Sequence, residues 1–316
     1  MVRHHDASPM DTGHPGPRSN WKDHIAMSVK AAAPRAGEAA GSAAWGLAHQ
    51  ACREAGIDVH QVHAAAECRG VVDLLNVIWG ASDLDIIDVA FMIALAHSGN
   101  LVAVATRSGS PTGAAVGFSG PPSTPFHSHI VGVVPEAAGH GVGRALKLYQ
   151  RAWCLERGVA TMAWTYDPLV ARNGYFNIRR LGALPRAYHC DFYGTMSDAI
   201  NAGQLSDRMV VGWDLTSTPP SVGSGAVDLD LGSGQIALSN DRDVPGAFQP
   251  PRGADGAVAL LGVPRDIEGI RRDDLDLAHI WRVRTREAFT NLLSDGWVIR
   301  DFTRSGHYVL HHERTP

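Results

Sequence analysis

The sequence of 316 residues has little of what marks several common protein classes. Its four cysteines, Cys52, Cys68, Cys154 and Cys190, show no Cys-x-x-Cys or other metal-ligand spacing, so we expect no metal site and reduced thiols in the cytoplasm. No apolar run reaches the length of a membrane span and no signal peptide is evident, so we expect no membrane partner. A net charge of -4 argues against a nucleic-acid partner.

Hydrophobic residues make up 45% of the chain, which is enough for a sizeable core. Residues 1–45 are rich in small and polar residues and predict a flexible tail, with one Ala-rich helix near residues 43–55. Residues 46–215 alternate strand and helix patterns. Residues 216–256 turn to Ser, Thr, Gly, Pro and Asp and predict a linker or an irregular insertion, whereas residues 257–316 predict a strand, a helix and a closing hairpin.

The order of the expected elements separates two fold classes. Hydrophobic periodicity predicts strands at residues 58–63, 101–106, 114–118, 130–134, 159–166, 184–192 and 209–215, and helices at 68–79, after Asp83, from Arg144 to Arg157 and at 170–181. This order, β-α-α-β-β-β-α-β-α-β-β, is not a series of βαβ units. It therefore favours an α+β arrangement around one mixed sheet over a Rossmann fold.

The strongest functional signal is the segment of residues 127–146, HSHIVGVVPEAAGHGVGRAL. An apolar strand ends at Pro135, and the glycine-rich residues 139–143 then open into a helical pattern. Glycines let backbone N–H groups approach phosphate oxygens, and the helix N-terminus adds a partial positive charge. The segment thus predicts a phosphate-binding loop between a strand and a helix.

Two familiar phosphate loops fit this segment poorly. A Walker loop ends in Gly-Lys-Ser/Thr, whereas Gly143 is followed by Arg144 and Ala145. A dinucleotide fingerprint follows the first strand with GxGxxG spacing, which is absent here. The stretch VVPEAAGHGVGRAL instead resembles the acyl-CoA loop of the GNAT superfamily of N-acetyltransferases, in which Val-x-Pro precedes Arg/Gln-x-x-Gly-x-Gly.

A second stretch supports the same resemblance. RNGYFNIRRLGA, downstream of the strand VATMAWTY, is similar to the family's second signature, and the likeness covers roughly residues 58–215. The stretches WTYDPL, RNGYFN, DFYG and SDR resemble a little-characterised bacterial branch whose C-terminal extension is similar to residues 257–316. The resemblance implies an α/β/α sandwich with a mixed, mostly antiparallel sheet, plus a small α+β extension.

The resemblance also implies a reaction, the transfer of an acyl group from acetyl-CoA or another acyl-CoA to a primary amine of a small molecule. We further expect a cytoplasmic protein that can form a homodimer. The residues implied for acyl-CoA are Val133, Val134, Ala138, Gly139, His140, Gly141, Val142, Gly143, Arg144, Asn173 and Phe176. Two other functions stay open. One is a non-catalytic acyl-CoA sensor or assembly module, and the other is a nucleotide phosphotransferase.

Three residues are candidates for catalysis. His127 and His129 share one face of their strand, because strand side chains alternate, and a histidine can accept a proton near neutral pH. Their spacing is similar to the His-x-His strand of arylalkylamine N-acetyltransferases, although the alternative is a pair of packed histidines. Asp167 follows a predicted strand, where it binds the amine or caps the next turn.

The chain departs from the family pattern at two positions. Ala138 stands where Arg or Gln is usual, so His140 or Arg144 must supply any side-chain contact to the pyrophosphate. Ile178 stands where the family often has its general-acid Tyr, and Tyr175 lies about one helical turn earlier.

Two further groups of charged residues invite a structural and a functional interpretation. Asp207 and Arg208 predict a structural ion pair or a substrate clamp. Trp281, Arg282, Arg284 and Arg286 predict a helix with one apolar face and solvated arginines, or a cover over the acceptor site.

Overall fold

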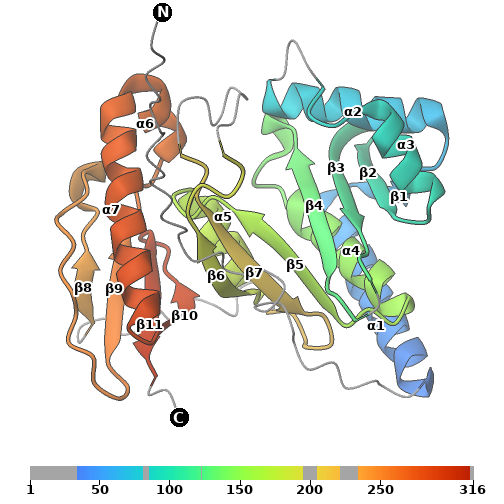
Figure 1. Ribbon diagram of the computed structural model, residues 1–316. Coiled ribbons are helices and arrows are strands. Elements are labelled where there is room, and N and C mark those ends of the chain that lie inside the picture. The colour runs from blue at the N-terminus through green and yellow to red at the C-terminus, as the bar shows by residue number, and fades with distance from the viewer. Residues whose placement is uncertain (1–33, 81–84, 122, 195–204, 221–233, 314–316) are drawn as a thin grey trace, which may run out of the picture.

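The computed structural model describes residues 34–80, 85–121, 123–194, 205–220 and 234–313 (Figure 1). Most of the predicted N-terminal tail, the predicted helix start at Asp83 and part of the predicted insertion lie outside these described residues. None of the helices in the described part is long and apolar enough to cross a membrane.

The larger sheet has seven strands in the order β1-β2-β3-β4-β5-β7-β6. Its strands are β1 (Asp58–Gln61), β2 (Leu101–Arg107), β3 (Ser110–Phe118), β4 (Phe126–Val133), β5 (Thr161–Tyr166), β6 (Leu184–His189) and β7 (Arg208–Asp214). Every neighbouring pair is antiparallel except β4 and β5, which run parallel. The predicted fold class, a mixed and mostly antiparallel sheet with flanking helices, is confirmed.

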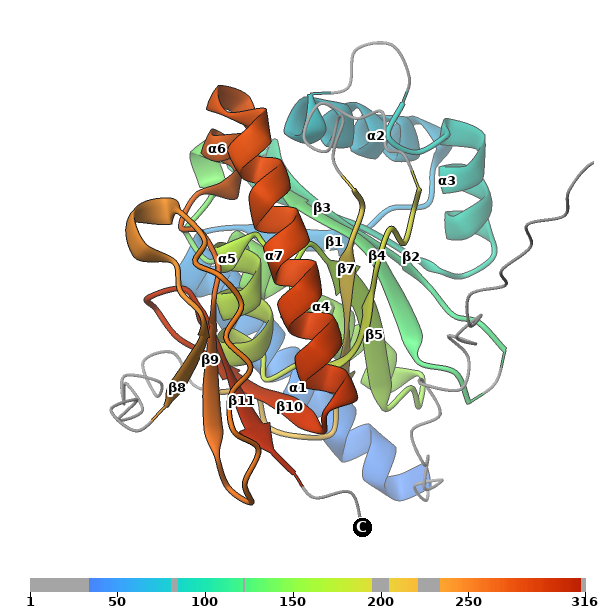
Figure 2. The ribbon, with the colours of Figure 1, turned by 60° about the vertical axis from the view of Figure 1, so that its left-hand side comes forward.

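Helices cover both faces of this sheet, which gives three layers (Figures 1 and 2). On one face, α1 (Pro34–Ala55) packs along α4 (Val142–Glu156) in the main hydrophobic core. On the other face, α2 (Ala65–Trp79) and α3 (Val89–His97) bury their apolar sides against β2 and β3. The alternating strand residues follow this division, since Ala103 belongs to the first core and Val104 to the second.

The first helix is longer than the sequence predicts. It begins at Pro34, inside the predicted tail, rather than near residue 43. Its buried side chains are small and recur every three or four residues, namely Ala44, Ala48, Ala51 and Ala55. At Gly41 a side-chain Cβ would lie 3.6 Å from the backbone of Glu156 on α4. The alanine and glycine content that suggests a tail therefore serves a close helix–helix contact.

The C-terminal residues form a second sheet of four strands in the order β10-β11-β9-β8. Its elements are β8 (Gln235–Leu238), β9 (Val258–Gly262), α6 (Ile267–Asp273), α7 (Leu275–Ser294), β10 (Trp297–Phe302) and β11 (His307–His312). The strand β8 lies inside the predicted insertion and pairs in parallel with β9. A strand of only four residues within a polar stretch gives too short an alternation to be recognised from the sequence.

The two sheets share one hydrophobic core. The main cluster includes Trp164 and Tyr166 of β5 together with Phe289, Phe302 and Tyr308 of the C-terminal residues. The contact is closest at α5 (Ala171–Gly174), where a Cβ on Gly174 would lie 2.6 Å from the Phe302 ring. The residues after α5, Tyr175–Arg180, form the π-helical segment η2. The C-terminal residues therefore pack directly on the elements that follow β5.

Candidate functional site

The parallel strands β4 and β5 separate after a short pairing. Their register contains only two pairs, Phe126 with Met162 and His127 with Ala163. Beyond these pairs β4 stays bonded to β3 as far as Val133, while β5 stays bonded to β7 as far as Tyr166. The strands thus diverge toward their C-terminal ends, as Figure 1 shows.

The free edge of β4 presents backbone groups to this gap. The Val134 N–H donates to the Thr112 carbonyl of β3 at 3.0 Å. Because successive N–H groups of a strand point in opposite directions, those of Val133 and Val131 point away from β3, toward β5. In the described part of the chain, no ladder pairing on that side extends past His127. An extended ligand in the gap would find unpaired donors and acceptors there.

The glycine loop lies at the open end of the gap. Gly139 and Gly141 have φ values of 78° and 86°, which glycine adopts without steric cost, and α4 begins at Val142. The exposed positions are those of Ala138, Gly139, His140 and Gly141, so a ligand can reach the first N–H groups of the helix. This is the arrangement expected of a phosphate site at a helix N-terminus.

Several residues predicted to bind acyl-CoA meet beside this loop. A Cβ on Gly143 would lie 3.8 Å from Val133 Cγ2 and 3.9 Å from the Phe176 ring, so these three residues converge. Arg144 is half-buried, and desolvation together with the charge of Arg180 lowers the pKa of its guanidinium. Two cations are therefore close to the loop, although Ala138 brings no polar side chain.

Three further residues of the second signature, Asn173, Tyr175 and Ile178, differ in their surroundings. Asn173 lies on α5 and is half-buried. Ile178 is buried in the main core, and the hydroxyl of Tyr175 accepts a hydrogen bond from Arg304 Nε at 3.3 Å. Ile178 therefore offers no hydroxyl, whereas Tyr175 has one that accepts from Arg304.

His127 and His129 lie side by side on β4. Their ring centroids are 5.8 Å apart, and both rings contact Phe118. The register between β3 and β4 shifts here, because Val116 pairs with Ile130 and Gly117 pairs with Ser128. His129 is consequently an extra residue in a bulge, which re-aims its side chain.

Both histidines favour the neutral form. Desolvation, then the charges of His129 and Lys147, lowers the pKa of His127 to about 4. Desolvation also lowers the pKa of His129, although solvent reaches this residue. Burial thus keeps both imidazoles neutral and at the same time makes them weaker bases than solvated histidines.

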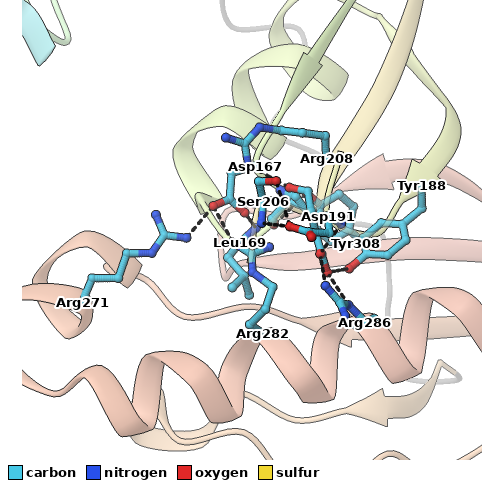
Figure 3. Close-up of polar contacts among 12 residues, drawn as sticks. Asp167, Leu169, Tyr188, Asp191, Ser206, Arg208, Arg271, Arg282, Arg286 and Tyr308 are labelled. Atoms are coloured by element: carbon cyan, nitrogen blue, oxygen red, sulfur yellow. Dashed lines mark hydrogen bonds and ion pairs between the residues drawn. The ribbon is translucent and has the colours of Figure 1, made fainter. Parts of the chain in front are cut away.

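Asp167 follows β5 and is held by the C-terminal residues (Figure 3). Its Oδ2 accepts hydrogen bonds from Arg271 of α6 and from Arg282 of α7, the latter at 2.7 Å. Its Oδ1 accepts from the Leu169 N–H at 3.0 Å, which is the predicted turn cap. Burial alone would raise the pKa of Asp167, but the two arginines outweigh it and hold this pKa well below its usual range.

Asp207 forms a second cluster of this kind with Tyr188 and Arg286, the two partners that Figure 3 labels. Its carboxylate pairs with Arg286 of α7 and accepts a hydrogen bond from the Tyr188 hydroxyl at 2.5 Å. Arg208 donates to the Asp207 carbonyl oxygen at 2.9 Å. The expectation of solvated arginines on the C-terminal helix holds for Arg284 but is wrong for Arg282, whose exposed fraction is 1%.

Lys147 is a residue of this region that the sequence interpretation misses. Its Nζ donates to Ser128 Oγ at 2.8 Å and lies 3.6 Å from the centroid of the Trp164 ring. Ser128 Oγ in turn donates to Gln150 Oε1 at 2.9 Å. The sequence does not mark this burial, because α4 also carries Arg144, Gln150, Arg151 and Glu156, and Lys147 looks like one more polar residue of an amphipathic helix.

No metal site accompanies these residues. Within the described residues, no group of three or more His, Cys, Asp or Glu side chains could hold a metal ion. The four cysteines are free thiols, three of them buried.

No family model and no curated protein matches the chain. Solved structures do match it. Several of them are described as acetyltransferases of the GNAT family. An N-acetyltransferase from Staphylococcus aureus is 13% identical with a TM-score of 0.42, and the match covers 50% of this chain and 98% of that one. A GNAT-family acetyltransferase from Streptococcus pneumoniae is 10% identical with a TM-score of 0.41, over 49% of this chain and 97% of that one.

A third match is yncA from Salmonella typhimurium, described as an acetyltransferase and solved with acetyl-CoA. It is 19% identical with a TM-score of 0.39, over 53% of this chain and 98% of that one. Because these identities and scores are low, we base the proposals below on the residues and geometry of this chain.

Proposed function

We propose that this protein is an acyl-CoA-dependent N-acyltransferase of the GNAT superfamily, with acetyl-CoA as the default donor. The observation that carries the proposal is the divergence of β4 and β5 after two residue pairs, with the glycine loop at the open end. An extended pantetheine arm fits between two strands of which one has a free backbone edge. A pyrophosphate fits the N-terminus of α4.

The roles of the cofactor-binding residues follow from this placement. Backbone groups of Val133 bind the pantetheine, and Phe176 packs beside it near Gly143. Val134 does not join them, because its N–H donates to the Thr112 carbonyl and its own carbonyl accepts from the Ala137 N–H. The N–H groups of residues 139–143 bind the pyrophosphate. His140 and Arg144 supply the side-chain contacts that Ala138 lacks, and the half-buried Asn173 of α5 is a further candidate.

The chemistry requires an oxyanion donor and a base. An N–H on the free edge of β4 polarises the thioester carbonyl. The acceptor nitrogen attacks this carbon, and its proton passes to His127 or His129 and then to water. The pKa of about 4 keeps the His127 imidazole neutral throughout the physiological range, and it also makes His127 a weaker base than a solvated histidine.

Asp167 enters this proposal as a residue that positions the end of β5. Both of its carboxylate oxygens already have partners, and its exposed fraction is 8%. A carboxylate so occupied is a poor ligand for an incoming amine. Its pairing with α6 and α7 instead fixes the turn that follows one wall of the gap.

We propose a small-molecule primary amine, such as an amino acid, as the acceptor, and the cytoplasm as the compartment. The net charge of -4 disfavours a nucleic acid, and four free thiols suit a reducing compartment. The experiment is calorimetric titration with acetyl-CoA and succinyl-CoA, followed by thiol release with a panel of primary amines. Binding with amine-dependent thiol release supports the proposal, and absence of acyl-CoA binding refutes it.

A non-catalytic acyl-CoA sensor is the second candidate. It is favoured by the buried Ile178, which stands where the family often has a general-acid Tyr. Binding of acetyl-CoA without thiol release on any amine of the panel would select the sensor over the enzyme.

A further inference from the structure

The closed end of the gap between β4 and β5 contains a buried amine. The last pair of the two strands is His127 with Ala163, so Ser128 and Trp164 are the first residues beyond the pairing. Lys147 Nζ contacts both, with Ser128 Oγ at 2.8 Å and the Trp164 ring centroid at 3.6 Å. A group that reaches the closed end of the gap therefore lies next to this nitrogen.

This amine has no counter-charge. Lys147 has an exposed fraction of 3%, and none of the ion pairs of the described residues includes it. A buried ammonium without a carboxylate is costly, and a methionine would fill the same space without this cost. Such a residue in a ligand gap is a candidate for a chemical role.

A second observation points to an absent ligand. Gln150 is fully buried, and its Nε2 has no hydrogen-bond partner. Its Oε1 accepts from Ser128 Oγ, so this unpartnered donor belongs to the same cluster as Lys147. Buried donors are normally satisfied by protein, water or ligand.

We propose that Lys147 donates the proton that the departing CoA thiolate takes up. This role rests on the proposed function, which places the thioester in the gap. Ile178 has no hydroxyl to act as the general acid, and Lys147 Nζ is a charged N–H donor at the closed end of the gap.

The proton balance is complete. The acceptor nitrogen bonds to the thioester carbon, the C–S bond breaks, and its electron pair stays on sulfur. A proton from Lys147 Nζ joins this sulfur, which gives the CoA thiol and a neutral lysine. The proton of the acceptor nitrogen leaves through His127 or His129, and Lys147 regains a proton from water after CoA has left.

The surroundings of Lys147 suit this role. A lysine ammonium in water, with a pKa of about 10.4, is a weaker acid than a thiol at about 8.5. Desolvation lowers the pKa of Lys147, which makes its ammonium a stronger acid, and Cys154 on the same helix opposes this shift. His127 precedes Ser128 on β4, so its side chain points to the opposite face of the sheet, although the charge of Lys147 contributes to lowering its pKa.

The first test compares Lys147→Met with Arg151→Met, which removes another buried cation from α4 that donates to the Ser217 carbonyl. With the best amine of the panel, we expect Lys147→Met to lower kcat by about 10²-fold or more with little change in KM for acetyl-CoA. In the native protein, kcat should fall at alkaline pH as Lys147 loses its proton. In Lys147→Met, kcat should show no such fall. Arg151→Met should keep both kcat and the pH profile.

The second test needs no acceptor. Native protein should bind CoA about tenfold more tightly than desulfo-CoA, the size expected of one charge-assisted hydrogen bond. Lys147→Met should remove this preference while binding desulfo-CoA as the native protein does, which also shows that it folds. Equal kcat values or equal pH profiles of native protein and Lys147→Met, or an unchanged preference for CoA over desulfo-CoA in the variant, would overturn the role of Lys147. These outcomes would leave the proposed function in place. Absence of acetyl-CoA binding by the native protein would overturn the proposed function and this role with it.

Discussion

Arg282 of α7 donates to the carboxylate of Asp167 at 2.7 Å, across 115 residues of sequence. Both side chains are buried, and Arg271 of α6 donates to the same oxygen. The end of β5, which forms one wall of the candidate site, is thus fixed by the C-terminal residues. This relationship makes the C-terminal residues part of the site's support.

Replacing Asp167 should therefore destabilise the whole protein. Asp167→Asn would leave Arg271 and Arg282 buried without a negative partner, and loss of one member of a buried pair costs about 3–5 kcal/mol. The measurement is the free energy of unfolding in urea at pH 7. Arg284→Met is the matched control, because it breaks an exposed pair with Glu287 on the same helix and should cost less than about 0.5 kcal/mol. Similar losses in the two variants would contradict this assignment.

The same ion pair predicts a pH dependence. The pKa of Asp167 is lowered in the folded protein, so its stabilising effect is present above the unfolded pKa of about 3.9 and is lost as the pH falls below it. Native protein should lose stability more steeply than Asp167→Asn between about pH 5 and pH 2. Urea unfolding at a series of acidic pH values would reveal this difference, and parallel slopes would count against it.

The tyrosine pair between the sheets offers a second test of their coupling. Tyr308 donates to the Pro168 carbonyl at 2.9 Å, and its hydroxyl lies 3.1 Å from that of Tyr166. Since Tyr308 uses its proton on Pro168, Tyr166 must donate to Tyr308. Tyr308→Phe leaves two buried groups, the Pro168 carbonyl and the Tyr166 hydroxyl, without their partner and should cost about 1–3 kcal/mol of unfolding free energy. Tyr166→Phe removes only the hydrogen bond to Tyr308 and should cost less. Unfolding free energies in the reverse order would refute this account.

The sequence predicts features that depend on nearby residues and misses those that depend on distant ones. Gly139, Gly141 and Gly143 lie within five residues of one another, so their spacing, with the preceding Pro135, is enough to indicate a loop before a helix. The partners of Asp167 lie more than a hundred residues away, and no periodicity connects them. Of its two predicted roles, the turn cap is local, and that contact is present.

Lys147 illustrates the same limit. Its place on α4 is predictable, but its contact with Ser128 and Trp164 depends on where β4 and β5 stop pairing. That point is set by the bulge at His129 and by the packing of two strands that are not adjacent in sequence. The length of α1 is missed for a related reason, since its alanines acquire a role only against α4.

The glycine loop should bind the donor through its backbone. Gly139→Ala places a side chain at a φ of 78°, which costs about 1–2 kcal/mol and shifts the N–H groups of the loop. We expect a weaker affinity for acetyl-CoA in calorimetry. Gly158→Ala is the control, because Gly158 has a φ of 73° and equally open space at the other end of α4. It should cost similar stability and leave the affinity unchanged; equal affinities in both variants would exclude the loop as the phosphate site.

The proposed base of the reaction is His127 or His129 of β4, the strand that also supplies the proposed oxyanion donor. Replacing both histidines tests this role. His127→Gln with His129→Gln should lower kcat by about 10²-fold and change the pH profile, while affinity for acetyl-CoA stays within a few-fold of native. By NMR, the imidazole of His127 should titrate at about 4, because desolvation and the nearby charges of His129 and Lys147 disfavour its protonated form. Phe118→Leu serves as the control, since it removes the ring that contacts both imidazoles and leaves the imidazoles in place. Activity of the double variant that equals the native activity at every pH would remove both histidines from the mechanism, and the proton of the acceptor would then have to pass directly to water.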